Sequence, residues 1–309
     1  MERVLVIGNG FDLDLGLKTN YCNFFNSDHF PNSKFNGGLI SSIRDKLIFS
    51  NWIDLEKEIK TFCIQLSQEA KRLPRVYNIE YFENIKNDFT LLTNGLNEYI
   101  NTIDYSQSNT NSTAAKLLKI FVQHFNGGNK IITFNYTPIL DLVNQFSAQE
   151  NRVKIKHVHG SVKQNNIIIG IEDDVLIHDQ LCFTIKSHNF HYESSNVRRT
   201  ISNAHEIIFF GHSLGASDYH YFQDFFQEQV KPKNDICKKI TIFTHNEKSK
   251  LDILLQLRNM NNNKTNHLFD NNEMKILCTG DKRDQQKIES YLKSLDNDLK
   301  PKDLSNLIY

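Results

Sequence analysis

Short apolar runs that end in glycine or a polar side chain are the feature that most restricts the fold of this chain. The runs are rich in Ile, Val and Phe and are separated by longer segments of mixed character. Continuous apolar character over so few residues is typical of strands that are buried on both faces of a parallel sheet. The predicted strands are VLVIG (4–8), KIITF (130–134), KIKHVH (154–159), NIIIGI (166–171), EIIFFG (206–211), KITIF (239–243) and MKIL (274–277). The sequence therefore predicts an α/β fold with a mostly parallel sheet.

Between the first two predicted strands, the apolar residues change to helical spacing. They recur three or four positions apart along residues 39–47, 55–66 and 82–96, which predicts amphipathic helices. We therefore expect a mainly helical insertion over residues 20–126, within a single α/β domain that spans all 309 residues. A further helix is predicted over residues 217–230.

Charge, cysteine content and hydropathy argue against several classes of protein. Lys plus Arg and Asp plus Glu both number 36, so the chain has no strong nucleic-acid footprint. The five cysteines are scattered and form no C-x-x-C pair, which favours reduced thiols over disulfides or a zinc site. No signal peptide and no apolar run near eighteen residues are present, so we expect a soluble cytoplasmic protein without a membrane partner.

Four of the predicted strands run directly into glycine-rich or polar turns. Because the carboxyl ends of parallel strands share one edge of a sheet, and open α/β sheets bind ligands there, we expect these turns to converge on one site. The turns are Gly8-Asn9-Gly10-Phe11-Asp12, Asn135-Tyr136-Thr137, His159-Gly160-Ser161 and Gly211-His212-Ser213.

Each turn also has a purely structural interpretation. The G-x-G turn over residues 8–12 either lets the backbone approach a phosphate or makes a tight strand-to-helix connection. Leu13 stands where a dehydrogenase fingerprint has its third glycine, which disfavours an ordinary dehydrogenase. Asn135 can hydrogen-bond within its own turn, and His159 can be a buried core histidine. The segment NWIDLEKE (51–58) is interpreted as a helix start with Asn51 as the N-cap.

Taken together, the ordered segments resemble the bacteriophage abortive infection AbiH family. The segments are NGFDLDLGLKTNY (9–21), WIDLE (52–56), FNYT (134–137), HVHGS (157–161) and GHSLGASDYHYF (211–222). The same set is distantly similar to the sirtuin-like NAD-consuming domains of bacterial defence systems. These carry a G-A-G-x-S turn, a strand-end Asn, a His-Gly pair and a late G-x-S turn. The resemblance implies an antiphage abortive-infection effector with a Rossmann-like sheet of the sirtuin NAD-binding type.

The resemblance also implies a reaction, a ligand and roles for individual residues. The expected reaction is hydrolysis of the N-glycosidic bond of NAD or a related nucleotide, which is a substrate and not a prosthetic group. Asn135 and His159 match the catalytic residues, and no metal is expected. Other partners to be considered are a second copy of the chain and a phage-derived trigger. The implied nucleotide-binding residues are Gly8, Asn9, Gly10, Phe11, Asp12, Thr137, Gly160, Ser161, Gly211, His212, Ser213 and Asp218.

Departures from that pattern leave the ligand and the activity open. Asn9 and Asp12 replace the Ala and Ser of the sirtuin-like turn, and Thr137 replaces an Asp. Two alternatives to the NAD-consuming enzyme therefore remain. One is a non-enzymatic nucleotide sensor on the same fold. The other is a serine hydrolase.

The serine hydrolase is suggested by GHSLG (211–215), which matches the nucleophile elbow G-x-S-x-G around Ser213. Its acid would be Asp252 or Asp270 and its base His267, although none of these follows a convincing strand.

Overall fold

One parallel sheet forms the centre of the protein. The computed structural model describes residues 2–47, 54–123, 128–146, 153–193, 196–231 and 237–299. Within these residues, six strands pair in the order β3-β2-β1-β4-β5-β6, and every pair is parallel. They are β1 (Arg3–Ile7), β2 (Asn129–Thr133), β3 (Lys154–His157), β4 (Glu206–Phe210), β5 (Lys239–Thr244) and β6 (Glu273–Cys278). This is the strand order of a doubly wound, Rossmann-like fold, and it confirms the predicted fold class.

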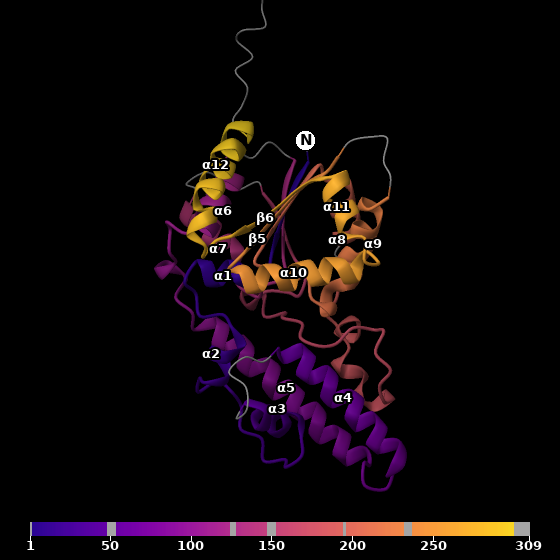
Figure 1. Ribbon diagram of the computed structural model, residues 1–309. Helices are drawn as coiled ribbons and strands as arrows, with labels where there is room; N and C mark the ends of the chain where they lie inside the picture. Colours follow the sequence, from indigo (N-terminus) through magenta and orange to yellow (C-terminus); the bar gives the residue numbers. More distant parts are fainter. Residues whose placement is uncertain are drawn as a thin grey trace, which may run out of the picture.

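Helices cover both faces of the sheet, which explains why the strands are apolar without alternation. Leu5 and Ile7 of β1 enter the apolar core on one face, and Val4 and Val6 enter the core on the other. Figure 1 shows the two helical layers on opposite sides of the sheet. The first layer contains α1 (Asn9–Asp14), α6 (Thr113–Gln123), α7 (Ile139–Phe146) and α12 (Lys282–Leu299). The second contains α8 (Val197–Asn203), α9 (Tyr219–Gln229), α10 (Glu247–Met260) and α11 (Thr265–Asn271).

A third apolar core belongs to a helical unit beside the carboxyl edge of the sheet (Figure 1). Its helices are α2 (Tyr21–Phe25), α3 (Leu39–Leu47), α4 (Leu55–Arg72) and α5 (Ile79–Asn101). The apolar positions predicted along these helices, such as Ile59, Ile85 and Leu92, are fully buried. The later helix α6, which also lies between β1 and β2, packs with α7 and α12 against the sheet.

The start of α4 differs from the sequence-based prediction. The N-cap is Asp54, whose side chain accepts hydrogen bonds from the backbone N–H groups of Glu56 and Lys57. The predicted cap, Asn51, and the neighbouring Trp52 lie outside the described residues. A carboxylate at this position satisfies free amides of the first turn and complements the helix dipole.

The prediction of a strand over residues 166–171 is wrong. The segment is extended, but its only ladder-like contact in the described chain is a single parallel bridge between Ile171 and Ile185. Gly170 has a φ of +153°, outside the β region, which interrupts a regular strand. Ile167, Ile169 and Ile171 pack instead into the core of the helical unit. The apolar run therefore correctly indicates a buried segment, but this segment belongs to the helical unit and not to the sheet.

The remaining described segments are short 3₁₀ turns. They are η1 (Tyr105–Gln107), η2 (Val162–Gln164), η3 (Asp179–Thr184), η4 (Lys186–His188) and η5 (Ala216–Asp218). The helix predicted over residues 217–230 is present as η5 followed by α9. In the described part of the chain, no helix combines the length and apolar character that a membrane span requires.

Candidate functional site

The four polar turns converge at the carboxyl edge of the sheet, as the sequence predicted. Gly8 follows β1, Asn135 follows β2, His159 follows β3 and Gly211 follows β4. Strand order reverses between β1 and β4, and open α/β sheets bind ligands at such a switch point. A cavity of about 250 Å³ opens there, between this edge and the helical unit. It is lined by Gly8, Asn9, Asp12, Thr19, Asn20, Tyr21, Cys22, Asp54, Glu56, Leu96, Ile100, Phe134, Asn135, Tyr136, Thr137, His159, Gly211, His212, Ser213 and Asp218.

Asp12 is the most unusual group in the cavity wall, because its carboxylate is fully buried and only half satisfied. Oδ1 accepts a hydrogen bond from the hydroxyl of Thr137 at 3.3 Å, whereas Oδ2 has no partner. Burial raises the pKa of Asp12 to about 7, although the neighbouring polar side chains of Asn135, Thr137 and Thr19 oppose this rise. An unpaired buried carboxylate oxygen is costly, so its position beside a cavity points to a hydroxyl or N–H group of a ligand.

Asn135 is held rigidly at the end of β2. Its side-chain Nδ2 donates to the carbonyl of Gly8 at 3.1 Å, and its backbone N–H donates to the hydroxyl of Thr133 at 3.1 Å. The first contact links the turns after β1 and β2 and fixes the orientation of the amide. In the described residues no donor reaches Oδ1 of Asn135, so that oxygen is available to a ligand.

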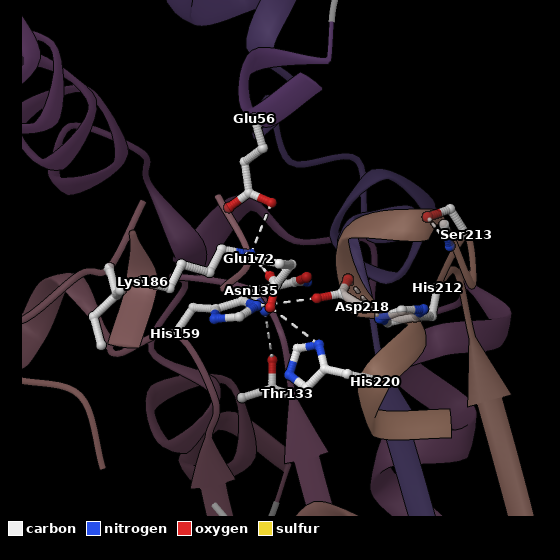
Figure 2. A network of polar contacts seen from close by, with 12 residues as sticks. Glu56, Thr133, Asn135, His159, Glu172, Lys186, His212, Ser213, Asp218 and His220 are labelled. Atoms are coloured by element: carbon white, nitrogen blue, oxygen red, sulfur yellow. Dashed lines mark hydrogen bonds and ion pairs between the residues drawn. The ribbon is translucent and has the colours of Figure 1, made fainter. Parts of the chain in front are cut away.

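His159 and His212 are buried, and both contact Asp218, whose side chain is 13% exposed (Figure 2). Oδ1 of Asp218 lies 3.3 Å from Nε2 of His159, and Oδ2 lies 3.4 Å from Nε2 of His212. Burial alone would raise the pKa of Asp218, but hydrogen bonds from His159 and His212 hold it well below its usual range. Asp218 is therefore an ionised acceptor placed between two imidazoles.

The contacts of Asp218 define the tautomers of both histidines. Nδ1 of His212 accepts a hydrogen bond from the backbone N–H of Leu214 at 3.0 Å, so the proton of this ring lies on Nε2. Because an ionised carboxylate only accepts, His159 likewise presents Nε2–H to Asp218 and keeps a lone pair on Nδ1. Burial, reinforced by the charge of Lys186, lowers the pKa of His159 to about 4, against the opposing effect of Asp218. His159 is thus neutral at pH 7 and has the protonation state of a base.

A buried charge cluster adjoins the group of His159, His212 and Asp218. The ammonium group of Lys186 lies 2.9 Å from Oε2 of Glu56 and 3.1 Å from Oε1 of Glu172, and Nδ1 of His220 lies 3.0 Å from Oε2 of Glu172. Figure 2 shows Glu56 approaching from the helical unit, with Lys186 between it and the His159–Asp218 pair. Burial disfavours the Lys186 cation, but the charges of Glu56, Asp218 and Glu172 outweigh burial and raise its pKa. The cluster therefore joins the helical unit to the carboxyl edge of the sheet.

The structure brings ten of the predicted site residues to the cavity wall. They are Gly8, Asn9, Asp12, Asn135, Thr137, His159, Gly211, His212, Ser213 and Asp218. Thr137 acts through its hydroxyl on Asp12, and Asn9 accepts a hydrogen bond from the hydroxyl of Thr19 at 2.6 Å.

Four of the predicted nucleotide-binding residues do not line the cavity. Phe11 is fully buried and packs edge-on against Phe210 in the core of the first helical layer. Gly160 has a φ of +76° and lies so close to Asn166 that a Cβ atom would be 2.0 Å from its carbonyl oxygen. Ser161 is buried, and its backbone N–H donates to the side chain of Asn166. These three residues shape the turns and not the cavity.

Gly10 is the fourth of these residues. Its lack of a side chain allows the backbone of Gly211 to approach closely, whereas the sequence predicted the approach of a phosphate. A Cβ atom at Gly10 would lie 2.7 Å from Cα of Gly211, so the glycine accommodates the neighbouring turn and not a phosphate. The backbone N–H groups of Gly8, Gly10 and Phe11 donate to the carbonyls of Phe210, Gly211 and Gly8. These three amides are therefore not free to bind the phosphate that the sequence predicted at this turn.

The loop around Ser213 does not have the contacts of a nucleophile elbow. The hydroxyl of Ser213 is exposed and accepts a hydrogen bond from the backbone N–H of Gly215 at 3.2 Å. His267 and Asp270 are exposed on α11, which directly precedes β6 and so lies toward the opposite edge of the sheet. Asp252 is exposed on α10. None of the three is brought to Ser213, and the buried side chains of this loop are His212 and Leu214.

Several groups of the site were not predicted from the sequence. Lys186 and Glu172 lie in no recognisable motif, and Glu56 was interpreted only as part of a helix start. His220 lies within the segment GHSLGASDYHYF (211–222), but no role was assigned to it. Tyr21 and Tyr136 line the cavity, and burial raises the pKa of both hydroxyls. The signal available for Glu56 was its place in WIDLE, which was already part of the resemblance. No metal-binding group of three or more His, Cys, Asp or Glu side chains is found among the described residues.

The fold is Rossmann-like, and a cavity lies at its switch point. Comparison with known proteins assigns the chain to a family. The family model described as bacteriophage abortive infection AbiH matches residues 4–243. The chain therefore belongs to the AbiH family, as the sequence segments indicated, and its family implies a role in phage defence by abortive infection. The match covers β1 to β5 and hence every residue of the site. No curated protein and no solved structure matches the chain significantly.

Proposed function

We propose that this AbiH protein binds NAD or a related nucleotide and hydrolyses its N-glycosidic bond. The observation that carries the proposal is the unpaired Oδ2 of the buried Asp12, which shares one cavity with Asn135 and the His159–Asp218 pair. Ribose offers vicinal hydroxyls as donors to Asp12 and to Oδ1 of Asn135. The cavity of about 250 Å³ is smaller than the roughly 300–1,000 Å³ of sites for drug-sized ligands. It suits a ribosyl group with its base, with the rest of a dinucleotide outside.

In the proposed reaction, the bond between C1′ of the ribose and the ring nitrogen breaks, and the electron pair of that bond stays on the nitrogen. A water oxygen attacks C1′ from the opposite side. Nδ1 of the neutral His159 takes one proton from this water, and Asp218 stabilises the imidazolium that forms. The carboxylates of the cavity, when ionised, favour the positive charge that develops on the ribose in the transition state. The products are the free base, the ribosyl product and a proton.

The experiment that tests the proposal is incubation of the purified protein with NAD, followed by measurement of released nicotinamide. Release that disappears in a His159→Ala variant, while the variant keeps the melting temperature of the parent, would support it. An unchanged NAD pool after prolonged incubation at a protein concentration near that of the nucleotide would contradict it. NAD that binds but stays intact would favour the nucleotide sensor.

A further inference from the structure

The cavity wall has an uneven charge. Four carboxylates line it, and in the described part of the chain no lysine or arginine does. The carboxylates are Asp12, Asp54, Glu56 and Asp218. Lys186 pairs with Glu56 but is itself only 3% exposed and is not part of the lining.

Two of the four carboxylates are already used by the protein. Asp54 accepts from the first amides of α4, and Asp218 accepts from His159 and His212. The remaining two, Asp12 and Glu56, have oxygens to offer. Oδ2 of Asp12 is fully buried without a partner. Glu56 uses Oε2 for Lys186, and no donor among the described residues reaches its Oε1.

Lys186 does not cancel the negative charge around it. The same ammonium faces three carboxylates, those of Glu56, Glu172 and Asp218. Burial raises the pKa of Glu56 to about 7 and also raises that of Glu172, so the cluster has its full net negative charge only when the pH is high enough to ionise both. Burial lowers the pKa of His159 and also that of His220, so neither of these two histidines adds a cation.

A buried site of this kind discriminates strongly between ligands by charge, because screening by water is weak there. A phosphate or carboxylate inside the cavity would be repelled by Asp12 and Glu56. An uncharged ring would leave the negative charge uncompensated, whereas a cationic ring would be attracted.

We propose that the cavity selects N-ribosyl compounds whose ring is positively charged, and that the carboxylate of Glu56 faces this charge. The inference rests on the proposed function, of which it specifies the substrate class: a ribosylated pyridinium or a similar cation, with any phosphates outside the cavity. It gives a role to Glu56, which reaches the site from the helical unit and not from the sheet (Figure 2).

The test compares two ligands that differ in ring charge but share a carbocyclic analogue of the ribose, the pyrophosphate and the adenosine. Carba-NAD has a methylene group in place of the ribose ring oxygen, which prevents cleavage and keeps the pyridinium cation; its dihydro form is uncharged at the ring. At pH 8, titration calorimetry should give a dissociation constant about tenfold lower for the cationic form, as expected for one partly screened charge pair. Equal affinity for the two forms, or no binding of either at millimolar concentration, would overturn the inference.

Variants of Glu56 assign the selectivity to this residue. Glu56→Gln keeps the shape and should bring the ratio of the two dissociation constants close to one, while Glu56→Asp keeps the charge and should retain a preference for the cation. Glu83→Gln, on the exposed surface of α5, is the matched control and should not change the ratio. Thermal melts identify a variant that fails to fold. In that case the affinities of the parent protein for the two carba ligands still test the charge selection.

Nicotinamide release from NAD is measured in parallel and separates the two proposals. A protein that prefers the cationic form but leaves NAD intact would retain the charge selection and lose the reaction. A protein that cleaves NAD but binds both carba forms equally would retain the reaction and lose the charge selection.

Discussion

Nε2 of His159 lies 3.3 Å from Oδ1 of Asp218, although 59 positions separate the two residues in the chain. His159 follows β3, the first strand in the order of the sheet. Asp218 ends the loop after β4, and β2 and β1 lie between these two strands. They meet because all strands are parallel and the loop after β4 folds back along the carboxyl edge. The pair gives His159 the tautomer and the orientation of a base.

The first prediction concerns this pair and Asn135. His159→Ala and Asn135→Ala should each lower the rate of NAD cleavage by a factor of roughly 10² or more, because each removes a group in contact with the reacting ribose or water. Asp218→Asn should also lower the rate, since an amide does not enforce the Nε2–H tautomer. The measurement is nicotinamide release under saturating NAD. Asp174→Asn, an exposed carboxylate in a nearby segment, is the control and should be fully active.

The second prediction distinguishes the serine hydrolase. Ser213→Ala should retain NAD cleavage, with at most a moderate loss of affinity of about 0.5–1.5 kcal/mol for one hydroxyl contact. A fluorophosphonate probe should leave Ser213 unlabelled, because no base in the described part of the chain contacts its hydroxyl. Labelling of Ser213, together with an active Asn135→Ala variant, would instead establish the hydrolase.

The third prediction follows from the contact between Gly10 and Gly211. Gly10→Ala would place a Cβ atom 2.7 Å from Cα of Gly211, and a backbone atom cannot move aside cheaply. Overpacking of this kind costs about 1–3 kcal/mol, more than the roughly 1 kcal/mol that alanine gains over glycine inside a helix. Denaturant unfolding should therefore show a loss of stability, even without ligand. At Gly215 the added atom meets only the Ser213 hydroxyl, at 3.2 Å, so Gly215→Ala should be much less harmful.

The sequence predicts those features of the structure that depend on local patterns of residues, and it does not predict those that depend on contacts between distant segments. The strands were predictable because a strand that is buried on both faces requires a continuous run of apolar residues. The common edge of Gly8, Asn135, His159 and Gly211 followed from the parallel order alone. The segment 166–171 has the same apolar signal, yet it packs against the helical unit, and no local pattern tells which layer receives an apolar segment.

The site was predicted where it lies at strand ends and missed where it depends on tertiary contacts. Lys186 and Glu172 come from a segment of irregular structure whose path is set by packing against α4 and α5. Their importance arises from being buried together with Glu56, which only the fold reveals. The glycines were recognised, but which neighbour each one approaches is likewise a property of the assembled turns.

The fourth prediction concerns the buried cation. Lys186→Met should lower the free energy of unfolding by about 3–5 kcal/mol, because it leaves Glu56 and Glu172 buried without a counter-charge. Adding Glu56→Gln to this variant should restore part of the loss, since one uncompensated charge is then removed. A double-mutant cycle by urea denaturation measures the coupling. Effects of the two substitutions that simply add would contradict the proposed dependence of Glu56 on Lys186.

The last prediction links the stability of the protein to the protonation of Asp12. Burial raises the pKa of this carboxyl from 3.8 to about 7. Below pH 3.8 Asp12 is protonated in both the folded and the unfolded state, so it does not lower the free energy of unfolding. Between these values the unfolded chain ionises more readily, and stability falls as the pH rises. Above pH 7 the loss is complete and amounts to about 4 kcal/mol, at about 1.4 kcal/mol for each pH unit.

Asp12→Asn removes this penalty while keeping an oxygen that can accept from Thr137. The variant should therefore be more stable than the parent at pH 8, with an advantage that shrinks toward pH 5, and it should bind nucleotide more weakly. Urea unfolding at several pH values measures the first effect and titration calorimetry the second, with Asp28→Asn on the surface as the control. If the difference in stability between Asp12→Asn and the parent is the same at pH 5 and pH 8, Asp12 does not carry a raised pKa. A gain in stability coupled to a loss of binding would identify Asp12 as a residue kept for its ligand at the expense of the fold.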